Sequence, residues 1–308
     1  MRRVRVTVPA TSANLGPGFD TLGLALALFN EFDVGEADTL DVKIEGEGAD
    51  RLPRDERSLV VRGARLVYEA AGRPWSGLRV RQVNRIPPAR GLGSSATAWL
   101  GGMLGANALL GGLVPPDTIM ELAVRHEGHP DNLAAALHGG LTVICWDADV
   151  RAVVSLPVPA ELRFALVVPD REASTAVARA VLPPTYPRAD AVFNVGRTAL
   201  LLAALAGERW ELLAAAMADR LHQPYRGQAL FPWLDRVFAA ARSAGALGVA
   251  LSGAGPSVLA VVGEADAPAV AQAMHEILRG DGLEARTLVL AADTGGARVT
   301  ELPEQFSD

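Results

Sequence analysis

Lysine is almost absent from this sequence of 308 residues. Lys43 is the only one, so every other member of the 29 lysines and arginines is an arginine. It lies in an alternating segment, residues 40–45, with no glycine-rich loop before it. We therefore expect neither a P-loop lysine, nor the strand lysine of protein kinases, nor a Schiff-base lysine in this protein.

Cysteine and long apolar runs are also scarce. Cys145 is the single cysteine, which leaves no intramolecular disulfide and no cysteine-built zinc site. No uncharged apolar run of about 18 residues occurs, so we expect no membrane-spanning helix. Residues 1–6 alternate polar and apolar side chains, a pattern that predicts a strand instead of a signal peptide.

Charge and hydropathy narrow the class of protein further. The formal net charge of −6 at pH 7 argues against a nucleic acid or an anionic membrane as partner. Half of the residues (50%) are hydrophobic, which is enough for a sizeable core. The length fits one large or two moderate domains. We expect a cytoplasmic protein with a small-molecule substrate.

Strands and helices alternate along the chain. In this order they favour an α+β fold of two packed layers over one doubly wound sheet. We place a boundary near Pro157 and Pro159, between an N-terminal nucleotide-binding domain, residues 1–157, and a C-terminal domain, residues 158–308. The patterns predict strands at residues 4–8, 40–44, 78–83, 141–146, 151–158, 164–168, 246–251, 257–262 and 286–291, and helices at residues 58–71, 94–110, 116–125, 190–205, 209–221 and 267–278.

Residues 87–98 have the composition of an anion-binding loop. Two prolines stiffen the approach, Gly91 and Gly93 leave backbone N–H groups open to an anion, and Ser94 suits the N-cap of the following helix. The helix dipole and the hydroxyls of Ser94 and Ser95 favour a triphosphate or Mg²⁺. The third glycine of a dinucleotide fingerprint and the lysine of a Walker motif are missing. The candidate contacts are Pro88, Ala89, Arg90, Gly91, Leu92, Gly93, Ser94, Ser95 and Ala96.

Two other segments end in compact turns. Residues 9–20 form a strand and a polar turn, from which Asn14 and Asp20 could reach an amine or a hydroxyl group of a ligand. Residues 252–257 form a small-residue turn between two apolar strands, where the backbone can approach a triphosphate. The candidate contacts in this second turn are Gly253, Ala254 and Gly255.

Together these segments span nearly the whole chain and resemble the motifs of the GHMP kinases, a family of galacto-, homoserine, mevalonate and phosphomevalonate kinases. Pro-x-x-x-Gly-Leu-Gly-Ser-Ser, residues 87–95, resembles the nucleotide loop of that family. Pro-Ala-Thr-Ser-Ala-Asn-Leu-Gly-Pro-Gly-Phe-Asp, residues 9–20, resembles the first motif of its homoserine kinase branch. Residues 252–257 resemble the late glycine motif.

The resemblance implies a fold and an activity. The N-terminal domain would be similar to the second domain of ribosomal protein S5, and the C-terminal domain would be ferredoxin-like. The activity would be transfer of phosphate from ATP, with Mg²⁺, to the side-chain hydroxyl of L-homoserine in threonine biosynthesis. We also expect a homodimer.

Residues 127–132, Glu-Gly-His-Pro-Asp-Asn, match a further segment of homoserine kinases. By this match Glu127 would hold Mg²⁺ beside Ser94 or Ser95, which suits an ion that takes few protein ligands. Glu121 is the competing carboxylate, because the length of this loop varies in the family.

A metal cluster of His126, His129 and Asp131 is a third interpretation of the same region. No further histidine or cysteine is placed to complete that cluster.

Asn132 stands where many relatives have a catalytic aspartate. An amide cannot be a general base, but phosphoryl transfer depends mainly on positioning and charge stabilisation. We expect in-line attack of the substrate hydroxyl on the γ-phosphorus, with Asn132 orienting that hydroxyl. The predicted catalytic set is Asn132, Ser94 and Glu127.

The resemblance assigns the acceptor site as well. Arg179 lies in a Ser-Thr…Ala-Arg-x-x-Leu-Pro segment and Arg226 in an x-Pro-x-Arg segment, and such guanidinium forks suit a carboxylate. Near the adenine pocket Ser58 replaces the asparagine usual in relatives, so the base contact there differs from the family's. The substrate set is Asn14, Asp20, His129, Asp131, Arg179 and Arg226.

Two alternatives to this activity stay open. One is a GHMP kinase for another small alcohol, against which the two arginine segments favour an amino-acid carboxylate. The other is a catalytically silent relative that binds a metabolite, against which the glycine loop, Glu127 and both arginines are intact.

Overall fold

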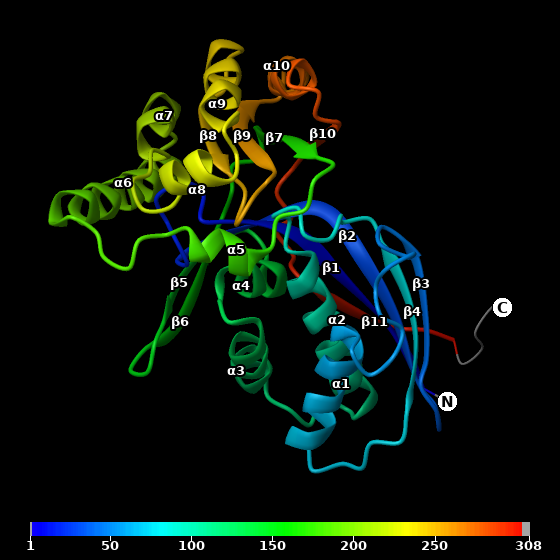
Figure 1. Cartoon of the computed structure of the whole chain (residues 1–308). Helices are drawn as coiled ribbons and strands as arrows, with labels where there is room; N and C mark the ends of the chain where they lie inside the picture. The colour runs from blue at the N-terminus through cyan, green and yellow to red at the C-terminus, as the bar shows by residue number, and fades with distance from the viewer. Residues whose placement is uncertain (1, 304–308) are drawn as a thin grey trace.

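The computed structural model describes residues 2–303, which form two β-sheets with helices packed against them (Figure 1). The first sheet runs β11-β1-β2-β4-β3, and β5 pairs with β2 and β6. Adjacent strands in this sheet are antiparallel except β3 and β4. These two strands pair in parallel, and helix α1 connects them along the chain. The strands are β1 (Arg3–Ala13), β2 (Leu22–Glu36), β3 (Asp41–Gly46), β4 (Leu78–Asn84), β5 (Leu141–Trp146), β6 (Arg151–Leu156) and β11 (Arg298–Glu301).

Four helices cover one face of this sheet (Figure 1). β1 points Val4, Val6 and Val8 into the core, each no more than 2% exposed, and α2 packs Trp99 and Met103 in the same cluster. The alternation that predicted the first strand therefore reflects one buried face. The helices are α1 (Leu59–Ala70), α2 (Ser94–Leu109), α3 (Pro116–Glu127) and α4 (Asp131–His138).

The second sheet has the antiparallel order β10-β7-β9-β8, with helices α9 and α10 over one face. This order, fourth, first, third and second along the chain, is the ferredoxin-like arrangement that was predicted. The strands are β7 (Leu162–Pro169), β8 (Gly248–Leu251), β9 (Val258–Gly263) and β10 (Ala285–Leu290). The helices are α5 (Thr175–Ala180), α6 (Arg188–Ala206), the short 3₁₀ helix η1 (Trp210–Leu212), α7 (Leu213–Ala216), α8 (Gln223–Ala229), α9 (Leu234–Ser243) and α10 (Ala267–Gly280).

A second core joins the two sheets. Leu22 and Leu24 of β2 form one cluster with Leu166 of β7 and Leu259 of β9, and none is more than 2% exposed. The boundary predicted between residues 157 and 158 falls between β6 and β7. The last strand, β11, nevertheless pairs with β1 of the first sheet, so the end of the chain returns to the N-terminal layer.

Some sequence interpretations fail in this fold, and the patterns also predict no element at α5, α8, α9 or β11. The patterns miss β2, the longest strand described, because its start is buried on both faces and such a run does not show which element it forms. The helix predicted at residues 209–221 is wrong, since the chain there forms η1, α7 and then a turn. The turn is held by the carboxylate of Asp219, which accepts the backbone N–H groups of His222 and Gln223 at 2.9 and 2.6 Å.

Helix α6 confirms the helix predicted at residues 190–205. By length and composition it is the one described helix that could cross a membrane, and 17% of the relevant stretch is buried within the protein. It is anchored to the protein by polar contacts: Asn194 donates to the carbonyl of Pro17 at 3.1 Å and to Asp219 at 2.7 Å.

Candidate active site

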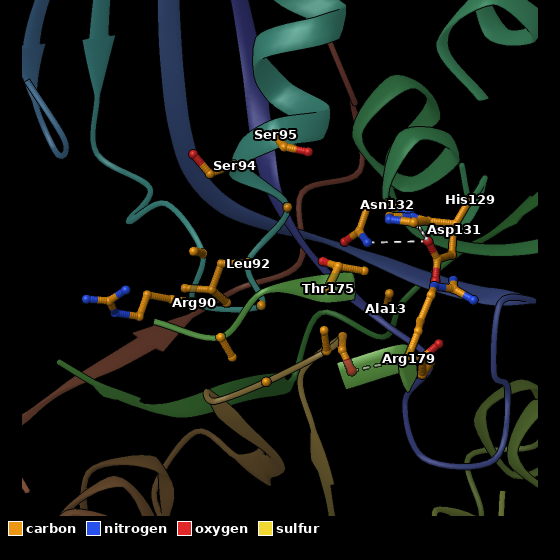
Figure 2. Close-up of a pocket in the computed structure, with 18 of the residues that line it drawn as sticks. Ala13, Arg90, Leu92, Ser94, Ser95, His129, Asp131, Asn132, Thr175 and Arg179 are labelled. Atoms are coloured by element: carbon orange, nitrogen blue, oxygen red, sulfur yellow. Dashed lines mark hydrogen bonds and ion pairs between the residues drawn. The ribbon is translucent and has the colours of Figure 1, made fainter. Parts of the chain in front are cut away.

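A pocket of about 620 Å³, counted to its open mouth, lies where the loops of the two layers meet (Figure 2). The pocket gathers most of the predicted residues from six separate parts of the chain. Its lining residues are Ala13, Asn14, Phe19, Asp20, Ala89, Arg90, Gly91, Leu92, Gly93, Ser94, Ser95, Glu127, His129, Asp131, Asn132, Ala173, Thr175, Arg179, Arg226, Gly253, Ala254 and Gly255.

Hydrogen bonds join the three turns that border this pocket. The N–H of Thr11 donates to the carbonyl of Leu92 at 3.1 Å, and the N–H of Gly253 donates to the carbonyl of Ala13 at 3.1 Å. The hydroxyl of Ser252 lies 2.7 Å from the carbonyl oxygen of Gly91. The end of β1, the glycine loop and the turn after β8 are therefore fixed relative to one another.

The glycine loop ends one residue earlier than its sequence suggests. Gly93, with φ +70°, occupies the N-cap of α2, while Ser94 is the first helical residue, so the predicted N-cap role of Ser94 is wrong. Position 93 itself requires glycine, because a Cβ there would lie 1.9 Å from Oγ1 of Thr11. Because α2 has no side-chain cap, its first N–H groups can meet an anion.

Other loop residues contribute in different ways. Arg90 lines the pocket, but its guanidinium donates to Asp170 at 3.0 Å and lies 3.5 Å from Glu172, so it ties the loop to the second layer. Ala96 is fully buried and lines no pocket described for the chain.

A neighbouring cavity holds the two remaining candidates, Ser58 and Pro88. It shares Ala89, Ser94 and Ser95 with the main pocket and is otherwise lined mainly by apolar side chains such as Leu52. The main pocket therefore connects, beside the glycine loop, with a mainly apolar cavity. Such a cavity suits a nucleoside base more than a phosphate.

Ser95 and Glu127 meet directly at the pocket, where the hydroxyl donates to the carboxylate. Glu121 instead pairs with Arg151 outside the pocket. Two adjacent oxygen ligands beside a phosphate-binding loop fit Mg²⁺, which prefers oxygen and completes its shell with phosphates and water.

Within residues 2–303, no group of three or more His, Cys, Asp or Glu side chains is arranged to hold a metal ion. His126 instead lies with its ring 5.6 Å from that of Trp99. The alternative cluster of His126, His129 and Asp131 is therefore not formed.

Asp131 organises the start of α4. Its Oδ1 lies 2.9 Å from Nδ1 of His129 and accepts the backbone N–H of Asn132 at 2.8 Å. Burial lowers the pKa of His129, but the hydrogen bond and charge of Asp131, with the charge of Glu127, outweigh it and raise that pKa above its usual value. Thr11 donates its hydroxyl to Oδ1 of Asn132 at 2.8 Å, which turns the amide NH₂ of Asn132 toward Asp131 and the pocket.

The two predicted arginines reach the pocket in different states. Arg179 forms a two-pronged ion pair with Asp20, at 2.9 and 2.6 Å, and both side chains are about one-third exposed (37 and 34%). Arg226 is 2% exposed and donates to the carbonyls of Ala178 and Gly253 at 3.1 and 3.0 Å. Burial lowers the pKa of Arg226 to about 10, so it still carries its charge at neutral pH.

The turn that carries Asn14 and Asp20 is conformationally unusual. Of five non-glycine residues with positive φ in the described chain, Asn14, Leu15 and Asp20 lie in this turn and Ala89 in the glycine loop. Such backbone strain concentrates at functional sites. The Asn14 amide accepts the N–H of Asp20 and donates to the carbonyl of Gly253, both at 3.0 Å, so Asn14 holds the turn in place.

Sequence reasoning missed several residues that complete this site. Thr11 lies within the first motif, but nothing in the pattern distinguishes it from its neighbours. Phe19 packs its ring 5.4 and 5.5 Å from the guanidinium carbons of Arg179 and Arg226. His222 directly precedes the segment Gln223–Arg226, and its role depends on a contact with Gly16, which is distant in the sequence.

Comparisons with known proteins match the chain over both layers. The model of the GHMP kinases N terminal domain matches residues 58–140, and that of the GHMP kinases C terminal domain matches residues 201–280. The homoserine kinase of Moorella thermoacetica is 45% identical over 294 residues, which cover 96% of this chain and 99% of that protein. The homoserine kinase of Carboxydothermus hydrogenoformans is 43% identical and covers 96% of each chain.

Solved structures give the same result. The crystal structure of homoserine kinase from Cytophaga hutchinsonii superposes with a TM-score of 0.87 at 32% identity, covering 97% of each chain. The galactokinase of Lactococcus lactis complexed with galactose superposes with a TM-score of 0.71 at 15% identity, a likeness of fold alone.

The contact between Gly93 and Thr11 predicts an effect on nucleotide binding. Gly93→Ala would force its Cβ against Oγ1 of Thr11 in addition to straining a positive φ. We expect the dissociation constant for ATP, measured by calorimetry, to rise by about tenfold or more.

Gly72→Ala is the matched control, because Gly72 also has a positive φ (+62°) but its Cβ would meet nothing within 4 Å. It should lower the melting temperature and leave ATP binding unchanged. Equal ATP affinity in the two variants would contradict the role of Gly93 in shaping the loop.

Proposed function

Because the chain belongs to the homoserine kinase branch of the GHMP kinase family, we propose that it transfers the γ-phosphoryl group of ATP to the side-chain hydroxyl of L-homoserine. This reaction makes O-phospho-L-homoserine in threonine biosynthesis. One observation carries the proposal beyond the family likeness: the glycine loop, the Ser95–Glu127 pair and both arginines line a single pocket. We further propose that the enzyme acts in the cytoplasm as a homodimer, which sedimentation equilibrium can test.

The nucleotide would lie along the glycine loop. Its phosphates would bind backbone N–H groups of the loop from Ala89 to Ser95, at the positive end of the α2 dipole. Gly253, Ala254 and Gly255 would close the opposite wall, since they line the same pocket. The adenine would enter the apolar side cavity that contains Ser58 and Pro88.

Mg²⁺ would be held by the Ser95 hydroxyl and the Glu127 carboxylate. When bound, the ion would neutralise negative charge on the phosphates during transfer. Support for Glu127 over Glu121 comes from its place in the pocket beside Ser95, whereas Glu121 pairs with Arg151 elsewhere.

The acceptor would bind where Asp20, Arg179 and Arg226 meet. The substrate carries an ammonium group, which Asp20 could bind, and a carboxylate, which Arg179 could bind. In this structure Asp20 and Arg179 neutralise each other's charge in an ion pair. An amino acid that supplies both charges can replace that ion pair without leaving either side chain uncompensated. A neutral sugar or an isoprenoid alcohol cannot, which favours an amino-acid substrate.

Each carboxylate that lines the pocket in residues 2–303 already has a partner, Arg179 for Asp20, Ser95 for Glu127 and His129 for Asp131, so none of them stands out as a general base. Asp131 is 3% exposed and is committed to His129 and the backbone of Asn132. Asn132, whose amide is oriented by Thr11, would donate a hydrogen bond and hold the acceptor hydroxyl in line with the γ-phosphorus. Ser94 would contact the transferred phosphoryl group, and the rate would come from positioning and charge stabilisation.

An ADP-release assay across homoserine, mevalonate, galactose and shikimate tests the function directly. Homoserine should be the preferred acceptor. Faster turnover of any of the other three would replace the proposed substrate, and no turnover of the four would indicate a metabolite-binding relative.

Removing the metal carboxylate should depress turnover. Glu127→Gln keeps the size of the side chain but weakens the ligand, so kcat should fall on the order of a hundredfold and the Mg²⁺ requirement should rise. Glu121→Gln loses only an exposed ion pair and should stay within about twofold of the wild type. Wild-type turnover in Glu127→Gln would transfer the role to another residue.

Base-free transfer predicts moderate effects at the acidic residues. Asp20→Asn and Asp131→Asn should raise KM for homoserine, with kcat falling by about a hundredfold or less. Steady-state kinetics with saturating ATP would measure both. A fall in kcat of about four orders of magnitude or more for either variant would identify it as a general base and refute the mechanism.

The arginines should control substrate choice. A charge-assisted hydrogen bond to a carboxylate contributes about 1.5–3 kcal/mol, so Arg179→Ala or Arg226→Ala should raise KM for homoserine roughly 10- to 150-fold. KM for ATP should hardly change. Lysine at either position should recover only part of the loss, because a point charge cannot form two parallel bonds.

An alcohol that lacks the carboxylate is the matched substrate control. It should be a much poorer substrate than homoserine for the wild type and lose this disadvantage in the alanine variants. Equal use of the two acceptors by the wild type would remove the arginines from substrate recognition.

A further inference from the structure

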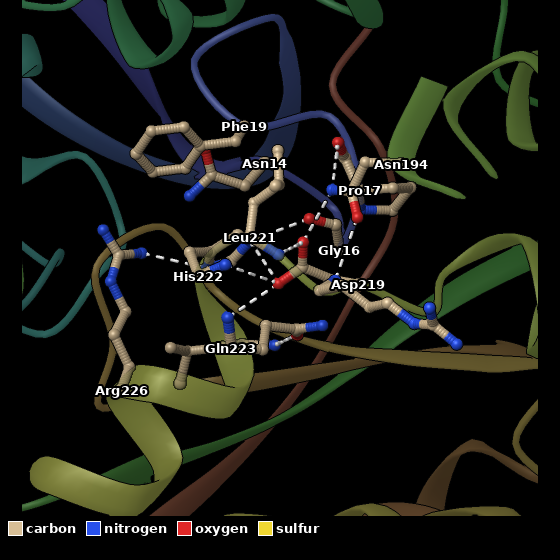
Figure 3. A network of polar contacts seen from close by, with 12 residues as sticks. Asn14, Gly16, Pro17, Phe19, Asn194, Asp219, Leu221, His222, Gln223 and Arg226 are labelled. Carbon is tan, nitrogen blue, oxygen red and sulfur yellow. Dashed lines mark hydrogen bonds and ion pairs between the residues drawn. The ribbon is translucent and has the colours of Figure 1, made fainter. Parts of the chain in front are cut away.

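His222 is a fully buried histidine that the proposed mechanism does not use. It lies directly before α8, between the turn at residues 14–20 and Arg226 (Figure 3). Its ring stacks on that of Phe19, with centroids 5.3 Å apart. A polar ring with no exposure needs a partner for each nitrogen.

The two partners of the ring determine its protonation. Nε2 lies 2.7 Å from the carbonyl oxygen of Gly16, and Nδ1 lies 3.1 Å from Nη1 of Arg226. A carbonyl oxygen only accepts and a guanidinium only donates, so Nε2 carries the proton and Nδ1 accepts from the arginine. The imidazole is therefore neutral. Burial lowers its pKa to about 4, in agreement with this assignment, although the charge of Asp219 opposes the shift.

His222 is itself held rigidly. The carboxylate of Asp219 accepts the backbone N–H groups of Leu221, His222 and Gln223 at 2.9, 2.9 and 2.6 Å, and the side chain of Asn194 at 2.7 Å. The position of the imidazole is thus set by the start of α8 and by α6 together. An imidazole ring held in this way can orient the side chain that is hydrogen-bonded to it.

That neighbour is Arg226. Its Nε donates to Ala178, and its Nη1 donates to both Gly253 and Nδ1 of His222. These three bonds set the plane of the guanidinium. Its Nη2 has no hydrogen-bond partner among residues 2–303, and the side chain lines the main pocket, so this edge is available to an anion.

We propose that His222 is a positioning residue that aims Arg226 at the carboxylate of the substrate and couples this arginine to the turn carrying Asp20. The inference rests on the proposed function, in which Arg226 binds that carboxylate. His222 does not contact the substrate. Its Nδ1 is the acceptor that orients Nη1 of Arg226. Its Nε2, through the bond to Gly16, keeps Arg226 at a fixed distance from the turn that carries Asp20.

Three substitutions separate the two hydrogen bonds of the ring. His222→Asn places an acceptor oxygen near the position of Nδ1 and loses the bond to Gly16. His222→Gln places a donor near Nε2 and loses the acceptor for Arg226. His222→Phe loses both and keeps an aromatic face for Phe19.

We expect His222→Phe and His222→Gln to raise KM for homoserine by about tenfold, with KM for ATP within about twofold of the wild type. His222→Asn should recover the share of the loss that comes from orienting Arg226 and keep the share that comes from the lost bond to Gly16. Equal effects of Asn and Gln, or a parallel rise of both KM values, would reduce His222 to a structural residue and overturn the inference. If His222→Phe does not fold, the comparison of Asn with Gln decides alone.

A double substitution tests the route through Arg226. Adding His222→Phe to Arg226→Ala should change KM for homoserine by less than about twofold, because the residue being positioned is already gone. Additive losses would contradict the inference.

The ring can also be observed without turnover. The ¹⁵N shifts of His222 at neutral pH should show a neutral imidazole with its proton on Nε2, and an imidazolium there would overturn the assignment. A wild type that releases no ADP with homoserine would instead refute the proposed function, whatever the shifts show.

Discussion

Main-chain hydrogen bonds between the end of β1, the glycine loop and the turn after β8 hold the site together. The N–H of Thr11 bonds to Leu92, and the N–H of Gly253 bonds to Ala13. Because the loops approach through their backbones, side chains have no room at the contacts: a Cβ on Gly91 would lie 2.2 Å from the carbonyl oxygen of Ser252. The glycine loop and the turn at residues 14–20 are therefore fixed relative to each other, which is the arrangement that the proposed in-line transfer would require.

The two arginines of the pocket are not equivalent. Arg179 is about one-third exposed and already paired with Asp20, so its charge is compensated. Arg226 is buried without a carboxylate bonded to it, and burial lowers its pKa. A buried charge that lacks an anion is costly, and a bound carboxylate would offset that cost. On this basis we propose that Arg226 favours an anionic group on the ligand, and that the pair of Asp20 and Arg179 favours a ligand that carries both charges.

Much of this could be predicted from short segments. The glycine loop was recognisable because its glycines and serines have a local physical role, and the strand at residues 4–8 because its valines alternate. The ferredoxin-like layer and the grouping of Glu127, Asn132, Arg179 and Arg226 depended on resemblance to a family. The predicted N-cap failed although Ser94 suits that role by residue type, because the cap position of α2 falls on Gly93. Position 93 in turn requires glycine, because Thr11 leaves no room there for a Cβ.

The sequence by itself determined the chemistry that the chain could offer: a glycine-rich loop without lysine, two candidate carboxylates for a metal ion, and arginines in place of lysines for binding anions. It did so because residue type and spacing fix local conformation and charge. Only the tertiary structure decided which arginine is paired and which is not, that Glu127 and not Glu121 faces Ser95, and that His222 is neutral. These outcomes depend on burial and on hydrogen bonds between segments 30 or more residues apart, and no local pattern records them.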